Sequence, residues 1–361
     1  MPNKTILADW YKENKVDLIS WQNFLVPKSF SGFENEYWAV RKKAGLFDTS
    51  YHGKIFLKGP QALKFLDFLV TGDLKELKAG EVKLTVLVNA KGRMLDDVTV
   101  FCLADQEYMV VTNAANTAGV LAWFKEQVKS LQLAKVVIED KTADFAKFDL
   151  QGPESLAILK KITQIKTEEL NYFNFKKADI FNFSGLISRS SYSGETGFEL
   201  FIPREKALPV WQKLLGLGLV PVGQEARECL RLENGFVSWD RDVDNETTPL
   251  EARYAWLVNF EKDFIGKAGL WNQKIKGTHK KLTGFKLQGK LIPAKNSPIL
   301  IKDKTAGLIT SAVFSPVLKA VIALGYLPLN KRQIGTGVAV LAAGKKILGA
   351  VDQVPFYKRA K

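Results

Sequence analysis

Two adjacent carboxylates, Asp96 and Asp97, stand at the head of the strand-like apolar run formed by residues 98–101. Aspartate is depleted in strands, and a carboxylate carried into a buried sheet must be hydrogen-bonded, paired or protonated. Consecutive strand residues face opposite sides, so these two cannot work as a paired acid and base. One of them should face a core or a cleft and the other should face solvent. On this stretch alone, the simpler interpretation is that both are solvated residues at the end of a hairpin turn.

The composition narrows the chemistry that the rest of the chain offers. The two cysteines, Cys102 and Cys229, have no CxxC or other ligand spacing, so neither a disulfide framework nor a zinc site is expected. Because His52 and His279 are the only histidines, a Ser/His/Asp triad or a multi-histidine metal site is not expected either. Chemistry must therefore rest on carboxylates, arginines and aromatic residues, without a metal.

The chain of 361 residues has a formal net charge of +14. A basic surface speeds the encounter with nucleic acid, with an anionic ligand or with an acidic protein, so charge alone does not choose among them. No basic run is denser than residues 276–281, and no nucleic-acid motif is present, so nucleic acid ranks last. The apolar runs are too short to span a bilayer and the N-terminus lacks a signal-peptide pattern, so no membrane partner is expected and the cytoplasm is the expected location.

A repeat organises the elements that must hold these residues. Residues 55–63 and 148–156 share a strand, a Gly-Pro turn and a helix start. Further on, residues 108–112 and 198–202 are each strand-like and each precede a helix. We infer two copies of a unit made of a strand, a helix, three strands and a helix.

Each copy is expected to carry antiparallel strands with its helices on one face, which is an α+β architecture and not a doubly wound parallel sheet. A pseudo-twofold axis between the copies would bring equivalent strand ends together. The strand that carries Asp96 and Asp97 would then face residues 192–199 of the second copy. Two helices, over residues 6–13 and 34–44, are expected before the repeat.

The chain after the repeat changes character. Residues 223–233 have helical spacing with Arg227 and Arg231 four apart, which is typical of a solvated, salt-bridged helix. Residues 282–356 alternate short β-like runs with Gly, Pro and Asn turns, which predicts a small all-β domain. The expected domains are a first region over residues 1–270, with repeated units at about 1–140 and 141–270, a linker at 271–281, and a β domain at 282–361.

Several stretches carry a family resemblance along nearly the whole chain. They are Ala44-Gly-Leu-Phe-Asp-Thr-Ser50, Lys58-Gly-Pro60, Gly92-Arg-Met-Leu-Asp-Asp97, Val111-Thr-Asn-Ala-Ala-Asn116, Gln151-Gly-Pro153, Tyr192-Ser-Gly-Glu-Thr-Gly-Phe-Glu199, Ala226-Arg-Glu-Cys-Leu-Arg-Leu-Glu233, Thr247-Thr-Pro249, Asp263-Phe-Ile-Gly-Lys267 and Phe314-Ser-Pro316. In this order they resemble the aminomethyltransferase, or T-protein, of the glycine cleavage system and its tetrahydrofolate-dependent relatives. The resemblance implies three domains in a ring around a central channel that holds the folate, with a C-terminal β-barrel.

The resemblance also implies roles for single residues. Asp97 aligns with the family's catalytic aspartate beside N5 of the pterin, whereas Asp96 should face away. Glu199 aligns with the glutamate that accepts hydrogen bonds from the pterin, a task that suits a carboxylate because an aminopyrimidine presents two adjacent N–H donors. The other expected folate-site residues are Tyr192, Arg227, Asn113 and Tyr357, the last near the channel mouth.

The implied reaction transfers the methylene group of an aminomethyl-lipoyl carrier, the H-protein, to tetrahydrofolate with release of ammonia. Polyglutamylated folate is an anion and such carriers are typically acidic, so the positive charge suits both partners. The chain departs from the family pattern at Ser50-Tyr-His-Gly53, Leu84-Thr85, Gly92-Arg93 and Glu228. Two alternatives therefore remain open: a folate-dependent methyl or one-carbon transferase with another donor, such as a demethylase, and a folate-binding protein without catalysis.

Overall fold

The computed structural model describes residues 2–359, and its internal contacts divide the chain into two compact units. The first unit comprises Met1–Leu87 and Asp96–Arg227, and the second comprises Val88–Leu95 and Glu228–Lys361. The hairpin tip at residues 88–95 is thus grouped with the C-terminal part of the chain.

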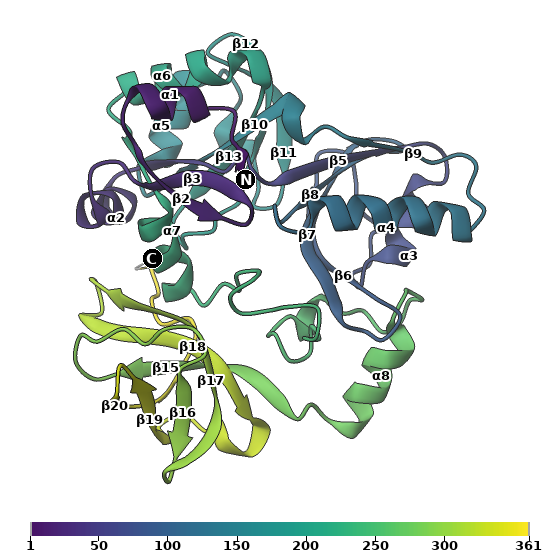
Figure 1. Cartoon of the computed structure of the whole chain (residues 1–361). Coiled ribbons are helices and arrows are strands. Elements are labelled where there is room, and N and C mark those ends of the chain that lie inside the picture. Colours follow the sequence, from purple (N-terminus) through teal and green to yellow (C-terminus); the bar gives the residue numbers. More distant parts are fainter. Residues whose placement is uncertain (1, 360–361) are drawn as a thin grey trace. The chain divides into compact units, whose positions relative to one another are not determined.

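The first unit contains the predicted repeat, and both copies have the same strand order (Figure 1). In the first copy the sheet runs β6-β7-β8-β5, and in the second it runs β11-β12-β13-β10. The first copy consists of β5 (Gly53–Lys58), α3 (Ala62–Leu69), β6 (Val82–Val88), β7 (Met94–Ala104), β8 (Glu107–Thr112) and α4 (Thr117–Ser130). The second consists of β10 (Phe145–Gln151), α5 (Ser155–Ile162), β11 (Phe175–Ile180), β12 (Phe183–Ser188), β13 (Gly197–Pro203) and α6 (Ala207–Gly216).

Each sheet has further strands beside the strand that begins its copy, which is β5 in the first sheet and β10 in the second. The sheet of the first copy gains β9 (Val137–Asp140), which pairs antiparallel with β5. The sheet of the second copy gains β4 (Gly45–Asp48), antiparallel to β10, and then the parallel strand β14 (Val220–Pro221). Because β4 lies in the second sheet and β5 in the first, the short segment between them, residues 49–52, crosses from one sheet to the other.

Backbone hydrogen bonds between the two copies have twofold symmetry. Val82 begins β6 and Phe175 begins β11, so the two residues hold equivalent places in the repeat. The N–H of Val82 donates to the carbonyl of Phe173 over 2.8 Å, and the N–H of Phe175 donates to the carbonyl of Gly80 over 2.7 Å. The predicted pseudo-twofold relation between the copies is present at this junction.

Helices cover one face of each sheet. In the second copy, alternate residues of β10, Ala146, Phe148 and Leu150, join one core cluster with side chains of α5 and α6, including Trp211. The short helix α1 (Ala8–Glu13) adds the buried ring of Tyr11 to this cluster. In the first copy, α3 and α4 pack together through Phe65 and Phe124, whose ring centroids lie 6.0 Å apart.

The opposite faces of the two sheets pack against each other. A second core cluster joins Met109 and Val111 of β8 with Phe201 of β13, and the rings of Phe101 and Phe201 lie 5.4 Å apart. Side chains two apart on a strand share a face, so Asp97 lies on the face of β7 that carries Phe101. By the same rule Glu199 shares the face of β13 that carries Phe201. The two predicted functional carboxylates therefore belong to faces that pack together.

The remaining elements of the first unit precede or follow the repeat. They are β1 (Asn3–Lys4), β2 (Asp17–Trp21) and β3 (Phe24–Ser29), which form a three-stranded sheet, and the helix α2 (Phe33–Lys42). The helix α7 (Gln224–Glu233) begins in the first unit and continues into the second.

The second unit contains a closed barrel with strand order β15-β18-β17-β16-β19-β20. Its strands are β15 (Lys280–Leu287), β16 (Pro298–Ile301), β17 (Lys304–Ser315), β18 (Ala320–Pro328), β19 (Gly337–Ala342) and β20 (Lys345–Asp352). Inward-facing aliphatic residues such as Ile299, Val321 and Val340 form its core. The helix α8 (Lys267–Lys276) precedes the barrel, and its Leu270 packs against Gly92 of the hairpin tip.

The predicted α+β class with a C-terminal β-barrel is confirmed, and three details differ. The first helix begins at Ala8, later than predicted, and α2 ends at Lys42, before Ala44. The segment at residues 271–281, expected to be a linker, holds the end of α8 and the start of β15. The ring of domains around a central channel stays a prediction.

Candidate functional site

A buried cluster of three charged side chains lies on the inter-sheet face of the second copy. Lys147 and Asp149 alternate with the core residues of β10, and Glu199 comes from the neighbouring strand β13. Asp149 and Glu199 stand directly opposite each other in the antiparallel register. Two like charges in that position repel each other, so a cation is needed beside them. We call Lys147, Asp149 and Glu199 the Lys147 cluster.

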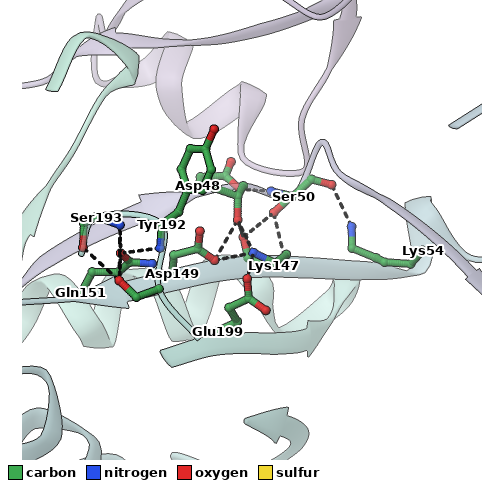
Figure 2. A network of polar contacts seen from close by, with 11 residues as sticks. Asp48, Ser50, Lys54, Lys147, Asp149, Gln151, Tyr192, Ser193 and Glu199 are labelled. Carbon is green, nitrogen blue, oxygen red and sulfur yellow. Dashed lines mark hydrogen bonds and ion pairs between the residues drawn. The ribbon is translucent and has the colours of Figure 1, made fainter. Parts of the chain in front are cut away.

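Lys147 supplies that cation, and its ammonium group has three acceptors. Its Nζ lies 2.6 Å from Asp149 Oδ1, 2.8 Å from Glu199 Oε1 and 3.2 Å from Thr49 Oγ1 (Figure 2). An ammonium group has three N–H donors, so all three are used. The side chains of Lys147 and Asp149 are 2% and 3% exposed, whereas that of Glu199 is 18% exposed. Glu199 is therefore the member of the cluster that is accessible to solvent.

Burial and charge act in opposite directions on this cluster. Burial opposes the charged form of Lys147, but the carboxylates of Asp149 and Glu199 outweigh it and raise the pKa of the ammonium group above its usual value. Burial raises the pKa of Glu199, and the charge of Lys147 works against that rise. The charge state of Glu199 thus depends on its contact with Lys147.

The segment that crosses between the sheets supplies further polar contacts. The backbone N–H of Thr49 donates to the carbonyl of Lys147 over 2.9 Å. Lys54 is fully buried, and its Nζ donates to the carbonyls of Ser50 at 2.8 Å and Thr142 at 3.4 Å. Burial and the neighbouring charge of Lys147 lower the pKa of Lys54 to about 7. Burial, with the charges of Lys147, Arg227 and Lys54, also lowers the pKa of His52 well below its usual value, so this imidazole is neutral at neutral pH.

The loop before β13 carries Tyr192 and is fixed from two sides. Gln151 Oε1 accepts hydrogen bonds from the backbone N–H groups of Tyr192 at 3.3 Å and Ser193 at 3.0 Å. A buried ion pair of 2.7 Å joins Arg41 Nη1 to Glu195 Oε1. These two anchors fix the loop backbone that carries Tyr192.

Arg227 of α7 lies over this ring. Its Cζ is 4.4 Å from the ring centroid of Tyr192, within the range of a cation–π contact. Two residues that the sequence assigned to one folate site are thus in contact.

The paired aspartates of β7 lie on opposite faces, as alternation predicted, but Asp96 is not solvated. Asp96 is fully buried, and Asp97 is partly accessible. Asp96 accepts hydrogen bonds from the backbone N–H of Asn113 at 2.9 Å and from the Nδ2 atoms of Asn113 and Asn116, both at 2.8 Å. The interpretation of two solvated hairpin residues is wrong, because the loop after β8 covers Asp96 with its own donors.

Asn113 joins the two carboxylates. Its Nδ2 also lies 3.1 Å from Asp97 Oδ1 and 3.2 Å from the carbonyl oxygen of Asp97. Burial and the neighbouring charge of Asp97 raise the pKa of Asp96 well above its usual value. Asn113, expected to contact folate, therefore uses its amide nitrogen to hold Asp96 and Asp97.

Tyr357 belongs to the second unit. It is partly buried, and its backbone N–H donates to the carbonyl of Glu233 over 2.9 Å. Among residues 2–359, no group of three or more His, Cys, Asp or Glu side chains could hold a metal ion. In the same part of the chain, no helix is both long enough and apolar enough to cross a membrane.

Family models match both parts of the chain. Residues 7–262 match the model described as the GCVT N-terminal domain, and residues 280–358 match the glycine cleavage T-protein C-terminal barrel domain. The chain belongs to the glycine cleavage T-protein family. The family and the transferase class predicted from sequence are thereby confirmed.

Relatives and a solved structure agree with this T-protein assignment over the full length. An aminomethyltransferase of Halothermothrix orenii is 37% identical over 98% of this chain and 99% of its own length. One from Desulfitobacterium hafniense is 35% identical over 99% of this chain and 98% of its own. The crystal structure of glycine cleavage system aminomethyltransferase T from Bartonella henselae has a TM-score of 0.93 and 28% identity, covering 99% of both chains.

Sequence reasoning missed Lys147 and Asp149 in this T-protein family member. The signal was present, because Lys147, Asp149 and Gln151 alternate with Phe148 and Leu150 directly before the second Gly-Pro turn. Such alternation is typical of a strand with one solvated face. The inter-sheet packing that buries this polar face comes from residues far away in the sequence.

Proposed function

We propose that this chain transfers the methylene group of an aminomethyl-lipoyl H-protein to tetrahydrofolate and releases ammonia. The observation that carries the proposal is the pair of carboxylates on facing strands, Asp97 on β7 and Glu199 on β13. Family membership over the full length supports the choice of reaction.

Glu199 is suited to bind the pterin of tetrahydrofolate. Its carboxylate is the accessible member of the Lys147 cluster, and an ionised carboxylate accepts two parallel hydrogen bonds from an aminopyrimidine. The cation–π pair of Tyr192 and Arg227 would complete the site, because an aromatic face and a planar cation both suit an aromatic, anionic ligand. Tyr357 is a further candidate for folate contact.

Asp97 is suited to the chemical step. In the reaction the methylene carbon gains bonds to N5 and N10 of tetrahydrofolate and loses its bonds to sulfur and to the amino nitrogen. The two protons that leave N5 and N10 pass to the sulfur and to the departing amine, so the atoms balance. Positive charge develops at N5 during attack, and a partly desolvated carboxylate held by Asn113 stabilises it at close range.

The protein must also orient its two substrates, tetrahydrofolate and the aminomethyl-lipoyl group, relative to each other. Bringing N5 and the aminomethyl carbon together in the correct geometry contributes several kcal/mol, on the order of 7–11 in the best cases. The net charge of +14 favours encounter with polyglutamylated folate and with an acidic carrier protein.

A donor assay tests the proposal. The purified protein is incubated with tetrahydrofolate and aminomethylated H-protein, and methylenetetrahydrofolate is followed. H-protein with an unloaded lipoyl arm is the control, and we expect product only with the loaded carrier. No product in the presence of measurable tetrahydrofolate binding would contradict this donor and favour a folate-dependent transferase with a different one.

A further inference from the structure

In the Lys147 cluster, all three N–H donors of the ammonium group have acceptors, and one carboxylate, that of Glu199, is accessible. Lys147 reaches Glu199 Oε1 at 2.8 Å and Asp149 Oδ1 at 2.6 Å, while Asp149 faces Glu199 directly across the ladder. Without the ammonium group, two carboxylates would stand side by side in a buried place, and one of them would take up a proton. Glu199 is the member that a ligand can reach.

We propose that Lys147 is the positioning residue of Glu199: it fixes the orientation of the carboxylate and keeps it ionised, so that Glu199 meets a ligand only as a hydrogen-bond acceptor. The identity of that ligand as tetrahydrofolate rests on the proposed function. Lys147 itself is 2% exposed and would act on the ligand through Glu199.

A purely structural role would not require this arrangement. Replacing a buried ion pair by neutral side chains of similar volume is often harmless to stability. In this cluster, however, the third member is partly exposed and its protonation depends on the other two. Lys147 therefore affects recognition at Glu199 in addition to folding.

Other charged and titratable groups surround the cluster from neighbouring elements. Each of them responds to a charge of the cluster or acts on a group that does, so each must be counted in any pH experiment. The groups that respond to a charge of the cluster are Tyr51, His52, Lys54 of β5 and Tyr172 before β11. Asp48 of β4 and Arg227 of α7 act in turn on Tyr51.

The decisive variant is the double substitution Lys147→Met with Asp149→Asn. The single change Lys147→Met leaves two unpaired carboxylates in a buried site and is expected to disturb folding. The double change removes one charge of each sign, and the new amide oxygen still accepts from Thr49 Oγ1, which lies 3.0 Å from Asp149 Oδ1. Lys54→Met is the matched control, because it removes another buried lysine of the network that does not contact Glu199.

The first readout is the ionisation of Glu199 itself and needs no ligand. Protein labelled with carbon-13 at the glutamate δ-carboxyl is titrated by NMR, and the signal of Glu199 is assigned by its loss in Glu199→Gln. We expect its titration midpoint to rise in the double variant, because the loss of the Lys147 ammonium group outweighs the loss of the Asp149 charge, and to stay at the wild-type value in Lys54→Met. An unchanged midpoint in a folded double variant would overturn the proposal.

The second readout is the affinity for tetrahydrofolate, measured anaerobically by calorimetry between pH 6 and 9. We expect binding at pH 7 to be about tenfold weaker in the double variant, with part of the loss recovered at pH 9, because Glu199 is then ionised without Lys147. Wild-type affinity at every pH would contradict the proposal. If the wild-type protein does not bind tetrahydrofolate at all, the proposed function fails, while the NMR titration still decides the role of Lys147.

Discussion

Asp96 and Asp97 point to opposite faces of β7, yet their carboxylates share one donor, the Nδ2 atom of Asn113, at 2.8 and 3.1 Å. Asn116 supplies a further donor to Asp96 from the same loop. The orientation of the accessible aspartate thus depends on the buried one, because both are held by the same side chain. Asp96 is therefore part of the support of Asp97.

The substitution Asp96→Asn should lower turnover without removing a group that touches substrate. One carboxylate oxygen becomes an N–H donor that faces Asn113 or Asn116, so at least one hydrogen bond is lost, at a cost of ~1–3 kcal/mol in the free energy of unfolding. We expect kcat to fall about tenfold, which corresponds to ~1.4 kcal/mol, through misplacement of Asp97. Steady-state kinetics and urea unfolding check this, with Asp105→Asn, an exposed aspartate beyond β7, as the control. Wild-type kinetics in Asp96→Asn would exclude the supporting role.

Tyr192 and Arg227 should contribute to tetrahydrofolate binding as one unit. Their contact at 4.4 Å orients each group against the other, so their contributions to binding should be coupled. In a double-mutant cycle with Tyr192→Leu and Arg227→Met, we expect a coupling free energy of ~0.5–2 kcal/mol in the dissociation constant. Tyr192→Phe, which keeps the ring, should retain most of the affinity. Strictly additive losses would show that the two side chains act separately.

Lys54 should make stability depend on pH above neutrality. Its pKa is lowered to about 7 in the folded protein, mainly by burial, and is about 10.4 in an unfolded chain. Between these values the unfolded chain binds the additional proton, so the free energy of unfolding rises with pH by up to ~1.4 kcal/mol per unit. The destabilisation of the folded protein by Lys54 is therefore greatest below pH 7 and decreases as the pH rises.

Urea unfolding of the wild-type protein and of Lys54→Met at pH 7 and pH 9 measures this effect. The wild-type protein should gain stability relative to the variant over that interval. Parallel pH profiles of the two proteins would mean that Lys54 keeps an ordinary pKa in the folded state.

The duplicated architecture was predictable because it rests on local signals. The two Gly-Pro turns, each between a strand and a helix, mark the start of each copy, and both Gly59 and Gly152 adopt the positive φ that such turns need, at +123° and +136°. Alternation along β7 likewise separated Asp96 from Asp97 correctly.

The burial of particular polar residues was not predictable, because it depends on contacts distant in sequence. Alternation tells which residues share a face and says nothing of what covers that face. Asp96 is covered by the loop after β8, and Lys147 by Thr49 and by β13. The family resemblance pointed to Glu199 but not to Lys147, because the residue that supports a binding group has no motif of its own here.

The most direct test of the central claim, that Asp97 serves the chemical step, is a single-turnover measurement. Wild-type protein and Asp97→Asn are mixed with tetrahydrofolate and aminomethylated H-protein, and the first turnover to methylenetetrahydrofolate is timed beside the dissociation constant of tetrahydrofolate. We expect a dissociation constant close to that of the wild type and a rate about 10²–10³-fold lower, as for loss of one charge-stabilising group. A wild-type rate in Asp97→Asn would contradict the claim.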